Sequence, residues 1–231
     1  MKPLLIIQNH KVETPGTIAD YMADRGLPYD LVHPYDGDSI PSGELYQASI
    51  VLGCPLSVHD TPNVEFLKHL YFHVAETIRN NRPYLGLCFG SQILAKAFGA
   101  SVEKNPNGKE IGTFPVKLTA DGQADPLFAG FPTEFPAFHW HGEMFKIPFG
   151  AKNLASSEIC SNQAFRVGNA MGIQFHFEAS SDKIPEWCRE YAQELVEVGT
   201  DAEAITTAFA KEAATMKQLN FRLLDNFLAM I

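Results

Sequence analysis

The sequence predicts an α/β fold: an open, mostly parallel sheet with helices on both faces and a small antiparallel extension. Two observations support this prediction. Over residues 3–99, short apolar runs alternate with segments of helical period, which is typical of parallel strands joined by helices. Over residues 111–175, short β-like runs are separated by Gly, Pro and Asn, which indicates hairpins and an antiparallel section.

The first part of the chain contains four predicted strands and three predicted helices. The strands are short, continuously apolar runs, as expected when both faces of a sheet are covered, and they span residues 3–8, 29–32, 48–52 and 84–87. The helices repeat apolar residues three and four positions apart and end at or before Gly or Pro, and they span residues 14–26, 64–80 and 91–98.

The second part changes character. Residues 105–112 (NPNGKEIG) predict a polar loop, and β-like runs follow up to residue 175. The segment 182–231 is expected to be helical. Its last 30 residues contain no Gly or Pro and predict one or two amphipathic helices. No repeat or linker interrupts residues 1–231, so we expect a single domain.

Composition limits the classes of partner. The chain carries 27 acidic and 18 basic residues, a formal net charge of −9, and such a field repels phosphate backbones. No apolar run approaches the roughly 20 residues of a membrane span, and no signal peptide is recognisable. We therefore expect a cytoplasmic protein that binds neither nucleic acid nor membrane, with its four cysteines as free thiols.

Residues 83–99 (PYLGLCFGSQILAKAFG) contain a Gly-x-Cys-x-Gly pattern centred on Cys88. A predicted strand precedes it and a predicted helix follows, which is the setting of a nucleophile elbow. Gly86 and Gly90 let the backbone approach closely, so the central residue is thrust outward. A helix N-terminus lowers a thiol pKa, and the N–H of Phe89 can point at a developing oxyanion. The pattern therefore favours a reactive cysteine over a buried structural one.

A nucleophilic cysteine needs a base, and residues 174–178 (QFHFE) supply a candidate. They follow the strand-like run 170–175, and residues i and i+2 of an extended chain share a face. We therefore expect His176 and Glu178 to flank one cleft, with Glu178 holding the imidazole in one tautomer. A lone histidine is more simply a hydrogen-bonded core residue, but the elbow at Cys88 favours the catalytic interpretation.

These motifs resemble those of the class I glutamine amidotransferase family. The family's Gly-x-Cys-x-Gly-x-Gln elbow is matched in full by residues 86–92, and its His-x-Glu by His176 and Glu178. The resemblance is strongest over residues 84–178. It implies the open, flavodoxin-like α/β fold and a catalytic triad of Cys88, His176 and Glu178.

The resemblance also has implications for the substrate pocket. Gln92 is expected to help hold the substrate, and the backbone near Ala164 and Phe165 is expected to line the pocket. The pieces at 110–116, 139–145 and 161–165 look like those of stand-alone members similar to the amidotransferase part of GMP synthases.

Two positions depart from the family pattern. Gly53-Cys54-Pro55 stands where the family usually has Gly-Gly-Pro, at the strand end whose N–H completes the oxyanion hole. We expect the hole to be formed by Gly53, Cys54 and Phe89. Phe177 stands where the family commonly has proline, which removes a rigid φ angle but keeps the two catalytic side chains.

His139 and His141 share one face of a predicted strand, and with Glu143 they are candidate metal ligands. A further ligand would have to come from elsewhere, such as His176 or Glu178, which conflicts with the triad. No defined ligand set or nucleotide-binding pattern is present, so we expect neither a metal nor an organic cofactor.

The resemblance implies a hydrolase that cleaves the γ-carboxamide of glutamine through a cysteine thioester. A separate protein is then the expected acceptor of the ammonia. Two alternatives stay open: a γ-glutamyl peptidase that uses the same triad, and a catalytically silent binding or regulatory subunit.

Overall fold

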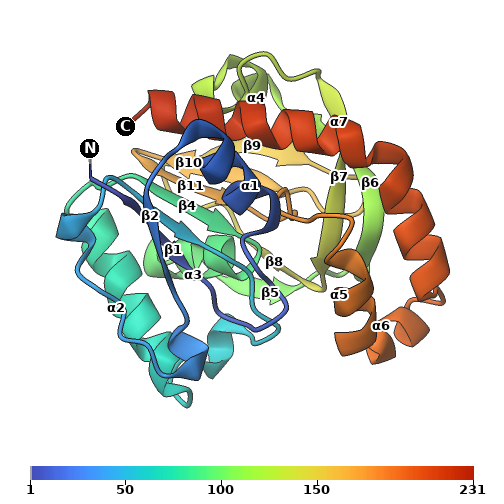
Figure 1. Cartoon of the computed structure of the whole chain (residues 1–231), viewed down its shortest axis with the longest axis horizontal. Helices are drawn as coiled ribbons and strands as arrows, with labels where there is room; N and C mark the ends of the chain where they lie inside the picture. The colour runs from blue at the N-terminus through green and yellow to red at the C-terminus, as the bar shows by residue number, and fades with distance from the viewer. Residues whose placement is uncertain (1) are drawn as a thin grey trace.

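The computed structural model describes residues 2–231, and its centre is a nine-stranded mixed sheet (Figure 1). The strand order across the sheet is β2-β1-β3-β4-β11-β10-β9-β6-β7. The predicted α/β class, with a mostly parallel open sheet, helices on both faces and antiparallel strands on one side, is confirmed.

Five neighbouring strands form the parallel part of the sheet. They are β1 (Leu4–Ile7), β2 (Tyr29–Val32), β3 (Ser49–Val51), β4 (Tyr84–Leu87) and β11 (Ala170–Ile173). Side chains of a strand alternate between faces, so Leu4 and Ile6 enter one core while Leu5 and Ile7 enter the core on the opposite face. This double burial explains why the strands are continuously apolar in sequence.

The antiparallel part follows β11. Its strands are β10 (Ala164–Val167), β9 (Lys152–Ser156), β6 (Glu110–Leu118) and β7 (Glu134–His141). A separate two-stranded ribbon pairs β5 (Val102–Lys104) with β8 (Glu143–Phe145). These strands account for the predicted β-like runs between residues 111 and 175.

Helices cover both faces of the parallel part (Figure 1). On one face α1 (Gly16–Arg25) packs beside the end of α7 (Ala202–Ala229). On the other face lie α2 (Glu65–Arg79) and α3 (Phe89–Ala97). Short helices α4 (Ala120–Ala124), α5 (Ile184–Glu190) and α6 (Ala192–Glu197) complete the fold.

Several predicted boundaries differ from the structure. The stretch 105–112 was expected to be a loop, but its last three residues begin β6 because Glu110 is buried and pairs with His141. The tail from 202 is one 28-residue helix, α7, capped by the side chain of Asp201. The helix expected over 91–98 starts two residues earlier, at Phe89, directly after the predicted nucleophile.

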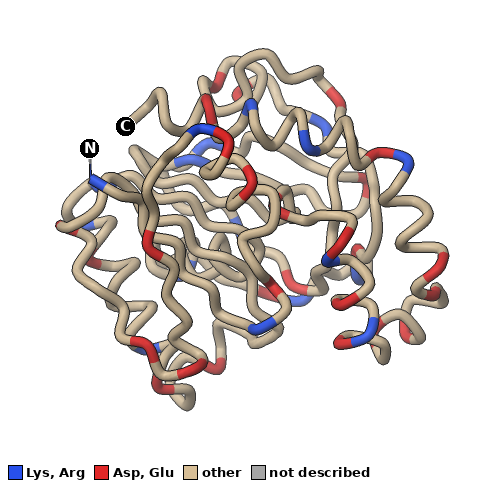
Figure 2. Tube along the Cα trace, viewed as in Figure 1, with Lys and Arg blue, Asp and Glu red and all other residues tan. Residues whose placement is uncertain are grey.

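Among residues 2–231, no helix combines the length and apolar character needed to cross a membrane. Figure 2 shows basic residues interspersed with acidic ones along the trace in this view.

Candidate active site

Cys88 occupies the sharp turn between β4 and α3, with φ 46° and ψ −107°. A positive φ is costly for a residue with a side chain, and such strain is typical of functional turns. Glycines make the turn possible. A Cβ added to Gly86 would lie 2.3 Å from the carbonyl oxygen of Gly90, and one added to Gly90 would lie 2.1 Å from that of Val51. The predicted elbow is therefore present in the backbone.

His176 and Glu178 come together with Cys88. Nδ1 of His176 lies 2.6 Å from Oε1 of Glu178, and His176 is close enough to Cys88 to shift its pKa. Sγ of Cys88 itself contacts the Trp140 carbonyl oxygen at 3.8 Å and accepts the amide of Gln174 at 3.5 Å. The two catalytic candidates do not lie on a regular strand, because β11 ends at Ile173. A bridge to Phe138 of β7 holds His176 instead, with its backbone N–H donating to the Phe138 carbonyl at 2.7 Å.

The three side chains are almost entirely buried, at 6% exposure or less. Burial raises the pKa of Cys88, and the neighbouring His176 offsets only part of that rise. The net direction is the opposite of the lowered pKa expected for a thiol at a helix N-terminus, and burial is its largest cause. Burial lowers the pKa of His176, but Glu178 and Cys88 raise it by more, to well above its ordinary value. Glu178 therefore stabilises the imidazolium form of His176.

The predicted oxyanion-hole residues lie at the ends of β3 and β4. The N–H groups of Cys54 and Phe89 donate no hydrogen bond to another residue within 2–231, so both can donate to a ligand. Cys54 does not have a positive φ, so its side chain fits where the family usually has glycine. Gly53 is the position that excludes a side chain: a Cβ there would lie 1.9 Å from Oε2 of Glu13.

Glu13 is a site residue that the sequence reasoning missed. It follows β1, and the residue is 4% exposed. Its Oε1 accepts a hydrogen bond from the hydroxyl of Tyr191 at 2.8 Å. Burial raises the pKa of Glu13 to about 7, against an opposing effect of His176. Its place after the first parallel strand could have identified Glu13, because the carboxyl ends of parallel strands lie at one edge of the sheet.

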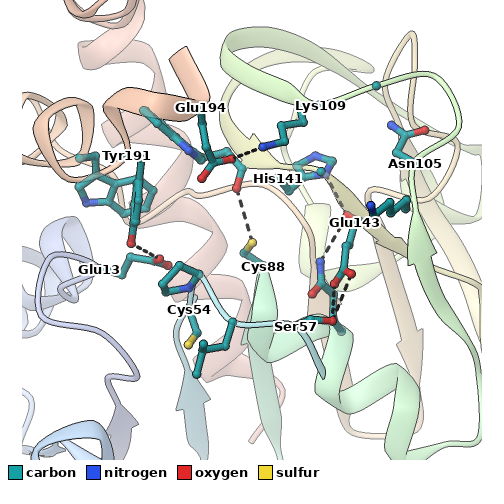
Figure 3. A pocket seen from close by; sticks show the side chains of 18 residues that line it. Glu13, Cys54, Ser57, Cys88, Asn105, Lys109, His141, Glu143, Tyr191 and Glu194 are labelled. Carbon is teal, nitrogen blue, oxygen red and sulfur yellow. Dashed lines mark hydrogen bonds and ion pairs between the residues drawn. The ribbon is translucent and has the colours of Figure 1, made fainter. Parts of the chain in front are cut away.

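A cavity of about 580 Å³ opens above Cys88 (Figure 3). In this view Glu13, Cys54 and Tyr191 lie on one side of Cys88, and Ser57 and Glu143 on the other. The remaining walls come from β5, the loop after it, β7 and the α5–α6 segment, including Trp187 and Glu194. The segment 182–231, expected only to be helical, therefore contributes Trp187, Tyr191 and Glu194 to the cavity lining.

Of the three predicted substrate-binding residues, Gln92 lines the cavity and the other two do not. Gln92 lines the cavity, and its amide nitrogen donates to the Glu143 carbonyl and to Oε1 of Gln174, both at 3.3 Å. Ala164 and Phe165 are fully buried in β10 and do not line the cavity, and the ring of Phe165 packs on Phe145. Their role in substrate binding stays a prediction that this placement does not favour.

The histidines of β7 gather with a different carboxylate from the one expected. One potential metal-ligand atom from each of Glu110, His139 and His141 lies within 4.8 Å of the other two. Glu143 instead accepts a hydrogen bond from Ser57 at 2.9 Å. The three groups already interact: Oε2 of Glu110 lies 3.0 Å from Nε2 of His141 and accepts the amide of Gln163 at 2.7 Å. Burial lowers the pKa of His139 to about 3, so it is neutral near pH 7. This arrangement can serve as a hydrogen-bonded network without an ion.

Comparisons with known proteins show which family and fold the chain resembles. Residues 11–190 match the family described as glutamine amidotransferase class-I. The chain is 28% identical over 225 residues to the putative glutamine amidotransferase-like protein YfeJ of Salmonella typhimurium, covering 95% of this chain and 91% of that protein. It is 35% identical over 190 residues to a GMP synthase of Thermosipho africanus, covering 79% of this chain but 34% of that enzyme. The crystal structure of a glutamine amidotransferase from Thermotoga maritima matches with a TM-score of 0.91 and 30% identity, covering 97% of both chains.

Proposed function

Because the chain belongs to the class I glutamine amidotransferase family, we propose that it hydrolyses the γ-carboxamide of glutamine through a thioester on Cys88. The observation that supports this most directly is that Cys88 lines a cavity and lies close to a His176 whose Nδ1 is 2.6 Å from the Glu178 carboxylate. The same observation argues against a catalytically silent subunit, which has no need of a buried, oriented histidine beside a strained cysteine.

The chemistry begins with attack of Cys88 Sγ on the γ-carbonyl carbon while His176 takes the thiol proton. The N–H groups of Cys54 and Phe89 donate to the oxyanion that forms. The C–N bond then breaks, and His176 returns the proton to the leaving ammonia. Water cleaves the thioester, releasing glutamate and the free thiol. Glu178 holds the imidazole in one tautomer and stabilises its charged form.

The side of the cavity near Gln92 suits the amino-acid end of the substrate. Lys104 and Glu143 are opposite each other in the backbone register of the β5–β8 ribbon, and both line the cavity. Glutamine carries an α-ammonium and an α-carboxylate, so one acidic and one basic group on this side are complementary to it. A separate protein that accepts the ammonia is part of the proposal if the enzyme works as an amidotransferase.

The test is glutamate release from glutamine by the purified chain and by Cys88→Ala, with Cys160→Ala as the matched control. Cys160 is also a buried free thiol but does not line the cavity. Cys88→Ala is expected to lose activity by about four orders of magnitude or more, while Cys160→Ala keeps it. Intact-mass analysis of acid-quenched turnover should find a γ-glutamyl adduct only when Cys88 is present. Wild-type turnover by Cys88→Ala would refute the assignment.

A further inference from the structure

The cavity is larger than a single free amino acid requires. Its 580 Å³ falls in the range of roughly 300–1,000 Å³ that is typical of pockets for drug-sized ligands. It extends past Cys88 on both sides: toward Ser57 and Glu143, and toward Glu13 and Tyr191 (Figure 3). If the amino-acid end occupies the first side, the second side is available for another part of the substrate.

The second side is where the leaving group must sit. A general acid has to reach the leaving nitrogen, and here the acid is His176. The edge of Trp187 packs on the His176 ring, with ring centroids 4.7 Å apart. A Cβ on Gly53 would lie 3.0 Å from Cε1 of His176 and 1.9 Å from Oε2 of Glu13, so the Glu13 carboxylate borders the same imidazole.

Glu13 offers an acceptor that the fold does not use. Its Oε1 is hydrogen-bonded to Tyr191, but its Oε2 accepts no hydrogen bond from the residues that the structure describes. This oxygen lies 1.9 Å from where a Cβ on Gly53 would be, and it belongs to a side chain that lines the cavity, so it is available to accept a hydrogen bond from a ligand. The other nearby acid, Glu194, is already paired with Lys109 at 2.9 Å.

We propose that Glu13, Trp187 and Tyr191 form a subsite for the leaving amine, and that the preferred substrate is a γ-glutamyl amide of a primary amine that carries no carboxylate. The amide N–H donates to Oε2 of Glu13, and the rings of Trp187 and Tyr191 pack against the alkyl or arylalkyl group. A leaving group that bears a carboxylate, as in a γ-glutamyl dipeptide, is repelled by Glu13. This inference rests on the proposed function of Cys88.

The reaction balances without a further reactant besides water. The Sγ–C bond to Cys88 forms as the C–N bond breaks, and the amine leaves with the proton that His176 took from the thiol. Water then adds to the thioester, so the products are glutamate and the free amine.

The test compares kcat/KM for four substrates: glutamine, γ-glutamylethylamide, γ-glutamylbenzylamide and γ-glutamylglycine. The wild-type chain is expected to prefer both amine-derived amides over glutamine and over γ-glutamylglycine by at least about tenfold. The assays are run at pH 8, above the Glu13 pKa of about 7. Glu13→Gln keeps the shape of the side chain but removes its charge there, so it should reduce the discrimination against γ-glutamylglycine by about tenfold. Glu186→Gln, a helix-surface substitution outside the cavity, should leave the discrimination unchanged.

Equal or better turnover of glutamine would overturn the inference, as would an unchanged preference in Glu13→Gln. Tyr191→Phe provides a second variant, because losing the hydroxyl frees Oε1 of Glu13 and should alter the same substrate ratio. Labelling of wild-type Cys88 by 6-diazo-5-oxo-norleucine separates the two proposals, since this glutamine analogue has no leaving amine. Labelling without the amide preference would reject only the amine subsite. No labelling and no turnover would reject the proposed function and the inference together.

Discussion

Oε1 of Glu178 lies 2.6 Å from Nδ1 of His176, and a bridge to Phe138 of β7 holds the histidine backbone. The carboxylate therefore selects the tautomer that presents Nε2 to Cys88. Phe177 between them replaces the proline common in the family without separating the two side chains.

Glu178→Gln should lower kcat by about three orders of magnitude with a much smaller effect on KM, because an amide stabilises the wrong tautomer and no imidazolium. Steady-state glutamate release measures both constants, and Glu186→Gln is the matched control. A kcat within a factor of two of wild type would mean that Glu178 does not orient the base.

Gly90→Ala should destabilise the fold by about 1–3 kcal/mol, because its Cβ would lie 2.1 Å from the carbonyl oxygen of Val51, which is backbone and cannot rotate away. Urea denaturation followed by circular dichroism gives the free energy of unfolding. Gly43→Ala is the control, since the nearest atom to a Cβ there lies 3.6 Å away. Equal stability of the two variants would contradict the close approach of α3 to β3.

Glu13 should make stability fall as the pH rises. Its pKa is about 7 in the folded chain, against 4.5 for an unperturbed glutamate such as that of the unfolded chain. Between these two pH values the folded state therefore holds a proton that the unfolded chain has released. This contribution is present below about pH 4.5 and lost as the pH rises through 7, and it totals about 3 kcal/mol at about 1.4 kcal/mol per pH unit.

Glu13→Gln removes this titration. The difference in free energy of unfolding between variant and wild type should therefore shift in favour of the variant from pH 5 to pH 8. Titrating groups that Glu13 does not influence, such as His139, are common to both proteins and cancel in the difference. A difference that stays constant over this range would show that Glu13 ionises as it does in water.

Cys88 should react slowly with iodoacetamide at neutral pH and faster as the pH rises, because burial raises its pKa and the thiolate is the reactive form. Peptide mapping assigns the modified thiol. The charge of Glu13 contributes to the raised pKa, so Glu13→Gln should move the labelling profile to lower pH. Rapid labelling that is already constant below pH 7 would instead indicate a resting thiolate.

Dialysis against a chelator should leave glutamate release unchanged, because the Glu110–His139–His141 cluster is hydrogen-bonded to Gln163 and the proposed chemistry uses no metal. Elemental analysis before and after dialysis is the accompanying measurement. Stoichiometric zinc before dialysis and loss of activity on its removal would contradict this prediction and show that the cluster binds a metal.

Local sequence patterns were sufficient to predict the parallel part of the fold and the turn at Cys88. The alternation of apolar runs and helical segments predicted the parallel strands, because a buried strand and an amphipathic helix each leave a short-range period in the sequence. The elbow at Cys88 was also predictable, since its strand, glycines and helix are contiguous. His176 and Glu178 were predictable because only one residue separates them.

Which residues distant in the sequence lie together at the site depends on the tertiary fold. Glu13 and Tyr191 are 178 positions apart, yet they share a hydrogen bond. Likewise, the partner of the β7 histidines is Glu110 on the adjacent strand and not the nearby Glu143. Such contacts depend on strand order, strand register and the docking of the α5–α6 segment over the sheet edge. These are long-range packing outcomes, and no local period in the sequence encodes them.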